Sequence, residues 1–217
     1  MDQKYFNKII SASIMGDGFF FKVDQENDKQ NTHYMLKQSV GHKDYVERIA
    51  EIVEQLTKVS ITINEPYVCD RGYNVDGQII LKTMRHPQYK KMYNRLYRHV
   101  GNTHVKVLDA HYLTMFDLES LAMMYMDDGW IESKECVTKE DYLRIGIATH
   151  KYTYYENLHL RDMLAERYSL HFDVTKHKQK SGEYKFYLRC NGRDNCLRFI
   201  DAVKDFVVPS YEYKLKV

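Results

Sequence analysis

The chain has little proline, few cysteines and no long apolar run, and each shortage excludes a class of protein. Three prolines in 217 residues argue against long disordered linkers. No apolar stretch approaches membrane-spanning length, and the polar start is not that of a signal peptide, so we expect no membrane partner. Because 44% of the residues are hydrophobic and 29% are charged, we expect a soluble, folded, intracellular protein.

The cysteines are too few and too widely spaced for a disulfide framework. They are Cys69, Cys136, Cys190 and Cys196, and none forms a CxxC pair. A zinc site of Cys190 and Cys196 with His171 or His177 is an alternative, but the spacing does not suit one. We therefore predict free thiols in a reducing compartment.

A strong excess of either charge is also lacking, since the net charge is only +2. The positive residues are nevertheless clustered. Residues 82–98 contain six Lys or Arg and no Asp or Glu, and residues 174–193 contain six against one Glu. This distribution indicates a basic surface, as in nucleic-acid-binding proteins, although solvated basic segments without a partner remain an alternative.

What the sequence does contain is one order of elements, repeated. Hydrophobic periodicity predicts two αββαββα units. In the first half we predict helices at 5–16, around 45–56 and at about 87–98, with strands at 19–23, 34–40, 60–64 and 78–83. In the second half we predict helices at about 117–127, around 155–164 and at 193–206, with strands at 130–133, 142–148, 171–176 and 183–189.

Three landmarks recur at nearly constant offsets in the two halves. Asp17-Gly18 and Asp128-Gly129 are 111 positions apart. His42-Lys43 and His150-Lys151 are 108 apart, as are Lys106 and Lys214. Three recurrences in the same order indicate two copies of one unit, with repeats at residues 1–108 and 109–217.

Two apolar segments, residues 10–18 and 121–129, end in Gly-Asp-Gly and Asp-Asp-Gly. The final Gly is an ordinary helix stop, but an Asp beside the negative end of a helix dipole is unfavourable. If the repeat is two-fold symmetric, Asp17 and Asp128 meet and repel one another. A divalent cation resolves this repulsion, because carboxylates and helix-end carbonyls form an all-oxygen site for phosphodiester hydrolysis. The alternative is that each Asp-Gly is only a turn.

Both segments resemble the signature of the LAGLIDADG homing endonucleases, the second more closely through Leu121-Ala122 and Asp127-Asp128-Gly129. The resemblance spans nearly the whole chain. Its C-terminal stretch, residues 208–215, is similar to the end of the monomeric, intron-encoded members. The resemblance implies an α+β fold in which two pseudo-symmetric repeats form a saddle-shaped pair of antiparallel DNA-binding sheets, with the motif helices packed at the centre.

The resemblance also implies roles for individual residues. It assigns catalysis to Asp17, Asp128, Lys106 and Lys214, and metal binding to Asp17, Asp128 and the carbonyls of Gly16 and Asp127. The implied cofactor is Mg²⁺, with Mn²⁺ as a substitute and Ca²⁺ supporting binding without cleavage. His42 and His150 occupy positions where family members carry a polar residue near the metals, but a structural histidine after a strand is the preferred interpretation.

One feature departs from the family. Its motif helices usually pack through small residues, and the first helix offers Ala12 and Gly16, four positions apart. The second helix has Met123 and Asp127 at the matching positions. Either the contact is asymmetric, or the second helix packs through another stripe of residues.

DNA contact is predicted from the alternation of side chains on strands, with apolar residues facing inward and polar or basic residues outward. The predicted DNA-binding residues are Lys37, Ser39, Lys82, Arg144, Lys176, Lys178, Lys180, Lys185, Tyr187 and Arg189. Because Phe19-Phe20-Phe21 is apolar throughout, the sequence does not decide which of these three faces DNA.

We therefore interpret the chain as a monomeric endonuclease that makes metal-dependent double-strand breaks at one long DNA site. It is expected in the cytoplasm of a bacterial or phage-infected host, or in an organelle matrix. The first alternative is a protein of the same fold that assists splicing of its host intron RNA or binds DNA without cutting it. The second is a generic α+β protein with two accidental Asp-Gly turns.

Overall fold

A computed structural model of the chain describes residues 2–21, 32–66, 76–134 and 142–217. Two of the four cysteines, Cys69 and Cys136, lie outside these ranges, as do the last two residues of the first predicted strand. Within the described part of the chain, no helix is both long enough and apolar enough to cross a membrane.

The first half folds as the predicted αββαββα unit. Its elements are α1 (Gln3–Met15), β1 (Phe19–Phe21), β2 (His33–Ser39), α2 (Lys43–Glu54), β3 (Val59–Asn64), β4 (Gln78–Thr83) and α3 (Pro87–Leu96). The strands form an antiparallel sheet in the order β1-β2-β4-β3, and a 3-10 turn, Val40–His42, leads from β2 into α2.

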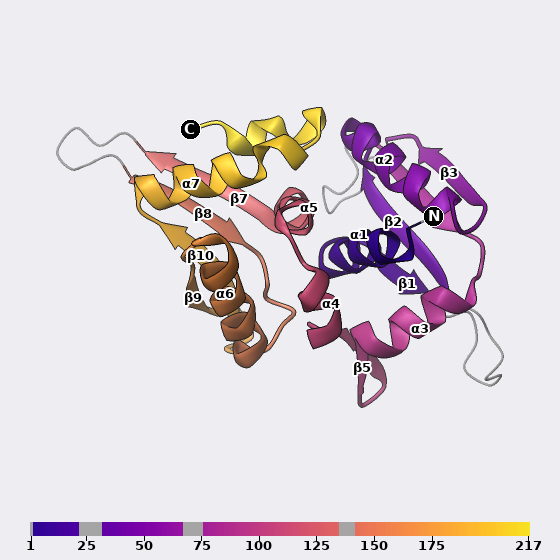
Figure 1. Cartoon of the computed structure of the whole chain (residues 1–217), viewed down its shortest axis with the longest axis horizontal. Coiled ribbons are helices and arrows are strands. Elements are labelled where there is room, and N and C mark those ends of the chain that lie inside the picture. Colours follow the sequence, from indigo (N-terminus) through magenta and orange to yellow (C-terminus); the bar gives the residue numbers. More distant parts are fainter. Residues whose placement is uncertain (1, 22–31, 67–75, 135–141) are drawn as a thin grey trace.

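The second half repeats this arrangement. Its elements are α5 (Leu118–Asp128), β7 (Gly129–Lys134), β8 (Tyr142–Ile147), α6 (Tyr154–Tyr168), β9 (Asp173–Lys178), β10 (Tyr184–Asn191) and α7 (Arg193–Val203). The sheet order β7-β8-β10-β9 matches that of the first sheet strand for strand. The predicted fold class of two αββαββα repeats is therefore confirmed, and Figure 1 shows the two halves side by side with α1 and α5 between them.

Local sequence signals explain where the helices begin. The side chains of Asp2 and Asp117 accept hydrogen bonds from the first backbone amides of α1 and α5. Thr153 and Glu156 form a capping box at the start of α6, and Pro87 occupies the first turn of α3, where its missing N–H costs nothing.

The packing of the core explains why the second motif helix, α5, is mostly apolar. One face of each sheet is covered by helices of its own half, with α2 against β2 and β4, and α6 and α7 against β9, β10 and β8. Helix α5 lies between the two layers, and its residues 119–126 are all buried. A helix that is apolar on all sides belongs in such a position, because each of its faces has a protein neighbour.

Three segments differ from the predicted elements. The chain leaves α3 earlier than expected and forms a hairpin of β5 (Tyr97–Val100) and β6 (Thr103–Lys106), which turns at Gly101 with a φ of 57°. A short helix, α4 (Ala110–Met115), then leads into α5. The predicted last helix stops at Val203 and continues as 3-10 turns, Lys204–Phe206 and Pro209–Leu215.

Candidate functional site

The two motif helices end at one place, and the contact there is asymmetric. Gly16 ends α1, and a Cβ at this position would lie 2.0 Å from Oδ2 of Asp127 on α5. The backbone N–H of Asp17 donates to that same oxygen at 3.0 Å. Of the two arrangements left open by the sequence, the structure therefore has the asymmetric one, in which Gly16 provides the space that the Asp127 carboxylate fills.

Gln38, on β2, connects two of the carboxylates at this junction. Its Nε2 donates to Asp17 at 3.0 Å and to Asp127 at 3.2 Å. Its Oε1 accepts from the hydroxyl of Tyr211 at 3.1 Å, and the hydroxyl of Tyr45 donates to Asp127 at 3.3 Å. Gln38 is not among the site residues predicted from the sequence, although a polar residue at an inward position of a strand is a signal for a functional residue.

Asp17 and Asp127 resist ionisation. Burial, followed by the negative charge of Asp128, raises the pKa of the Asp17 carboxyl. Burial and the charge of Asp17 raise the pKa of Asp127 well above its usual range. Asp17 keeps contact with solvent, which weakens the effect of burial on its carboxyl, whereas Asp127 and Asp128 are half-buried. Asp17 and Asp128 thus share one electrostatic environment, as the two-fold repeat predicts.

The two lysines predicted from the repeat both reach this junction. Lys106 Nζ donates to the carbonyls of Gly16 at 2.8 Å and Gly18 at 2.7 Å. Lys214 Nζ donates to the carbonyl of Met126 at 2.6 Å, in the last turn of α5. Burial and the positive charge of Lys151 lower the pKa of Lys106 to about 7, and burial lowers the pKa of Lys214. Each lysine therefore lies at the end of the motif helix in its own half.

A third lysine lies at the junction and was not predicted there. Lys151 Nζ contacts Asp128 at 2.8 Å and the carbonyl of Gly16 at 3.0 Å. The sequence paired Lys151 with Lys43, but Lys43 lies on the surface of α2 and forms an exposed ion pair with Glu47. Because the two lysines lie in different settings, this landmark does not mark equivalent positions.

The two histidines of the same landmark are also not equivalent. His42 is the residue before α2; it stacks on Tyr211 and lies 3.2 Å from the hydroxyl of Ser210. The corresponding position before α6 is Thr153. His150 lies beside Tyr187, on the second sheet. His42 is thus a structural histidine, as preferred from the sequence.

The donors at the junction suit a hard cation. They are carboxylate and carbonyl oxygens from two helix ends, and burial together with the charge of Asp128 raises the pKa of Asp17. Among the residues that the structure describes, no group of three or more His, Cys, Asp or Glu side chains is arranged to hold a metal. Backbone carbonyls such as that of Gly16 lie beside these carboxylates and offer further oxygen ligands.

The thiols that the sequence offered for zinc are close together but lack further ligands. The sulfur atoms of Cys190 and Cys196 lie 3.6 Å apart, and both residues are buried, free cysteines. Neither His171 nor His177 completes a cluster with them in the described part of the chain. The structure therefore favours free thiols over the zinc alternative at this pair.

The outer face of the first sheet carries the polar residues predicted there. Lys37 lies opposite Ile80, and Ser39 lies opposite Gln78. Lys82, paired with Met35, is on the same face, while the alternate residues Leu36 and Leu81 are buried. Among the phenylalanines of β1, Phe19 pairs with Met35 on this outer face, and Phe20 is buried in the core.

The second sheet divides the predicted basic residues between its two faces. Arg144, Lys185, Tyr187 and Arg189 share the outer face. Lys176 is paired with Phe186 and Lys178 with Tyr184. These residues lie on the same face of the sheet as the buried Leu188. Phe186 packs against Tyr154 of α6, so Lys176 and Lys178 extend from the helix side of the sheet, and Lys180 lies in the turn beyond β9. The strand register therefore corrects the prediction of a common face.

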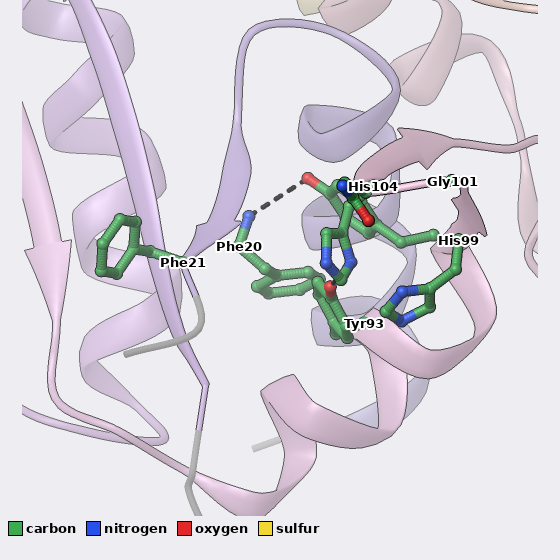
Figure 2. Close-up of a pocket in the computed structure, with 8 residues that line it drawn as sticks. Phe20, Phe21, Tyr93, His99, Gly101 and His104 are labelled. Atoms are coloured by element: carbon green, nitrogen blue, oxygen red, sulfur yellow. Dashed lines mark hydrogen bonds between the residues drawn. The ribbon is translucent and has the colours of Figure 1, made fainter. Parts of the chain in front are cut away.

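One pocket is separate from this junction. It has a volume of about 520 Å³ and lies between β1 and the β5–β6 hairpin. Figure 2 shows Phe20 and Phe21 leaving β1 in opposite directions, and a hydrogen bond of 3.3 Å from the Phe20 amide to the Tyr97 hydroxyl. Its lining is aromatic and histidine-rich, namely Phe20, Phe21, Tyr93, Tyr97, His99, Gly101, Asn102 and His104. It contains no carboxylate, so the chemistry expected from the motifs lies elsewhere.

Comparisons with known proteins agree with the fold. A profile of the LAGLIDADG DNA endonuclease family matches residues 7–195. The homing endonuclease I-WcaI, bound to its DNA recognition sequence, is similar with a TM-score of 0.71 and 18% identity, over 99% of this chain and 87% of that one. A search of curated proteins finds no match.

Two further solved structures share the fold at lower similarity. I-SmaMI bound to an uncleaved DNA target in the presence of calcium ions has a TM-score of 0.56 and 10% identity, over 95% of this chain and 87% of that one. I-DmoI in complex with DNA and Mn has a TM-score of 0.52 and 15% identity, over 92% and 96%.

Proposed function

Because this chain belongs to the LAGLIDADG DNA endonuclease family, we propose that it cuts both strands of one long double-stranded DNA site by metal-dependent phosphodiester hydrolysis. The observation that carries this proposal is that Asp17 and Asp128 lie at the ends of two packed helices, close enough for the charge of Asp128 to act on Asp17, with lysines around them. An accidental pair of Asp-Gly turns has no reason to produce this arrangement at equivalent positions in two repeats.

In this proposal the oxygen atoms of the junction hold divalent ions. The carboxylates of Asp17 and Asp128, with the carbonyls of Gly16 and Asp127, are the ligands. When bound, a cation such as Mg²⁺ stabilises charge on the attacking and leaving oxygens of a phosphodiester. Mn²⁺ is expected to substitute, and Ca²⁺ to support binding without cleavage. Gln38 holds the Asp17 carboxylate in place through its 3.0 Å hydrogen bond.

Lys106 and Lys214 supply the basic groups, one for each half. Both lie within 3 Å of a motif carbonyl, so their positions are fixed by the helix ends. An ammonium group there stabilises negative charge on the scissile phosphate. With its pKa lowered to about 7, Lys106 is also neutral in a large fraction of molecules near neutral pH, and the free amine accepts a proton from the attacking water.

DNA lies across the outer faces of the two sheets in this proposal. The contacting side chains are Lys37, Ser39 and Lys82 on the first sheet, and Arg144, Lys185, Tyr187 and Arg189 on the second. The repeats, residues 1–108 and 109–217, each read one half of the site. Because the two faces carry different side chains, we expect a single chain to read an asymmetric target.

A cleavage selection tests the proposal. The protein is incubated with a library of randomised duplexes and Mg²⁺, and cut molecules are sequenced. The selected duplex is then given to Asp17→Asn and Asp128→Asn, which we expect to bind it as the unmodified protein does but to cut at least about 100-fold more slowly, as for removal of a transition-state charge contact.

The outcomes of this experiment discriminate between functions. Normal cleavage by either Asn variant would remove the aspartates from the active site. A duplex that is bound but never cut, under any divalent ion, would make the chain a DNA-binding protein of the same fold.

A further inference from the structure

The positively charged ammonium group of Lys151 lies between the ends of the two motif helices. Its ammonium lies 2.8 Å from Oδ2 of Asp128 and 3.0 Å from the carbonyl oxygen of Gly16. One ligand thus comes from the end of α5 and the other from the end of α1. An aspartate of one motif and a backbone carbonyl of the other are oxygen atoms that the proposed function assigns to a divalent ion. The ammonium group therefore occupies contacts that such an ion needs.

The surroundings of this contact favour a strong interaction. The Lys151 and Asp128 side chains are 27% and 19% exposed, so the pair is partly shielded from water, unlike an exposed surface ion pair. Lys106 donates to the same Gly16 carbonyl at 2.8 Å. Two lysine amino groups thus share one oxygen atom, and an arriving cation must displace both of them from it.

The first motif lacks this arrangement. Asp17 accepts its side-chain hydrogen bond from the neutral amide of Gln38. The strand register shows which residues of the two halves correspond here. Phe19 pairs with Met35 in the first sheet, and the residues 111 positions later, Trp130 and Gly146, pair in the second. The same offset makes Val40, an apolar residue, the counterpart of Lys151.

We propose that Lys151 competes with the divalent ion at Asp128, so that the two motif aspartates bind metal with unequal affinity. Before an ion binds there, the ammonium must leave Asp128 and Gly16. In the described part of the chain, the Asp17 carboxylate accepts its side-chain hydrogen bond from the neutral amide of Gln38, so an ion there displaces no ammonium group from the carboxylate and Asp17 fills first. This inference rests on the proposed function, since it assumes that both aspartates are metal ligands.

Mn²⁺ titration, followed by the electron paramagnetic resonance signal of the free ion, tests this inference without cleavage. The background is Asp17→Asn in the full chain, so that Asp128 is the remaining one of the two carboxylates proposed as metal ligands. Adding Lys151→Met or Lys151→Gln should tighten Mn²⁺ binding at least about tenfold, the lower end of what a neighbouring charge does to a carboxylate. Lys151→Arg keeps the charge and should leave binding weak. Lys43→Met, on the surface of α2, is the matched control and should change nothing.

The alternative outcomes are distinct. Circular dichroism first establishes that each variant folds, and two neutral replacements guard against misfolding of one. Equal or weaker Mn²⁺ binding in both neutral variants overturns the role of Lys151 while leaving the metal site in place. If Asp17→Asn/Asp128→Asn binds Mn²⁺ as well as the unmodified protein does, neither aspartate is a ligand, and the proposed function fails together with this inference.

Discussion

At the scale of single residues, the junction disfavours charge of both signs. Burial is the first cause of the raised pKa values of Asp17 and Asp127 and of the lowered pKa values of Lys106 and Lys214. Acids that gain protons easily and bases that lose them easily lie within one hydrogen-bonded network. The ionisation of this network therefore changes when a cation or a phosphate binds to it.

The pH dependence of cleavage should report Lys106. Its pKa of about 7 means that the neutral amine predominates only above that pH, so the single-turnover rate should rise through about pH 7 and then level off. Asp17 acts in the same direction, because its raised pKa makes the carboxylate available only as the pH rises. Rates measured from about pH 5.5 to about pH 9 on the selected duplex test this.

Lys106→Arg is the control, since arginine stays protonated throughout. An unchanged rate and pH profile in that variant would exclude Lys106 as a base.

The lowered pKa of Lys106 also makes the stability of the protein depend on pH, and the direction follows from which state binds more protons. Between about pH 7 and the ordinary lysine value, the unfolded chain holds the proton that folded Lys106 has lost, so the free energy of unfolding contributed by this residue rises with pH.

At the scale of elements, the contact between α1 and α5 depends on one missing side chain. Gly16→Ala places a methyl group 2.0 Å from Asp127 Oδ2 and 2.7 Å from its Cβ, so the helices must separate. We expect a loss of about 1–3 kcal/mol in the free energy of unfolding, typical of overpacking. Chemical denaturation of both proteins measures it.

Gly41→Ala is the matched control for this substitution. A Cβ at Gly41 finds only the Ser39 hydroxyl, 3.8 Å away, so stability should change little. Combining Gly16→Ala with Asp127→Gly removes the obstructing side chain and should recover part of the loss. A Gly16→Ala protein as stable as the parent would mean that the helix ends are not tightly packed.

The opposite ends of the same two helices are held by a partly buried ion cluster. Glu119 of α5, 8% exposed, accepts from Lys8 of α1 at 2.7 Å, from Arg48 of α2 at 2.6 Å and from the Tyr5 hydroxyl. Glu119→Ala leaves Arg48 without this carboxylate and Lys8 with Asp117 as its remaining partner in the cluster, and we expect a loss of about 3 kcal/mol in the free energy of unfolding. Glu47→Ala, which removes an exposed pair with Lys43, should cost no more than about 0.5 kcal/mol. Equal losses in the two variants would contradict this role of the cluster.

Elements with a strong local signal were predictable, and contacts between elements were not. The strand at Gln78–Thr83 agrees with its predicted range, because its alternating pattern matches a half-buried strand. The β5–β6 hairpin was missed, because the helical pattern of α3 runs on into a Tyr-rich stretch that pairs as strands only through β6. Lys151 was missed because its sequence landmark aligned it with Lys43, and only the strand register relates it to Val40.

At the scale of the whole molecule, the two halves have equal topology but unequal outer faces. The first sheet presents Lys37 and Lys82 there, next to apolar partners such as Ile80 and Met35. The second presents Arg144, Lys185 and Arg189. On that face Glu132 lies opposite Arg144 and Asp173 lies opposite Arg189, so two of these three positive charges face a carboxylate, whereas Lys37 and Lys82 face uncharged partners.

The two faces of the second sheet give a matched pair of substitutions. Lys185, on β10, points to the outer face, where its partner on β9 is His177; Lys176, one position earlier on β9, extends from the helix side with Phe186. If DNA lies on the outer face, Lys185→Ala loses a phosphate contact and Lys176→Ala does not. The logarithm of the binding constant, plotted against that of the salt concentration, should become shallower by about 0.9 for Lys185→Ala and stay unchanged for Lys176→Ala. Lys176→Ala removes no contact with the core, because Lys176 is exposed and lies over the exposed ring of Tyr184. A larger effect of Lys176 would mean that the hairpin of β9 and β10 turns its other face to the duplex, and the DNA path proposed for this half would have to be redrawn.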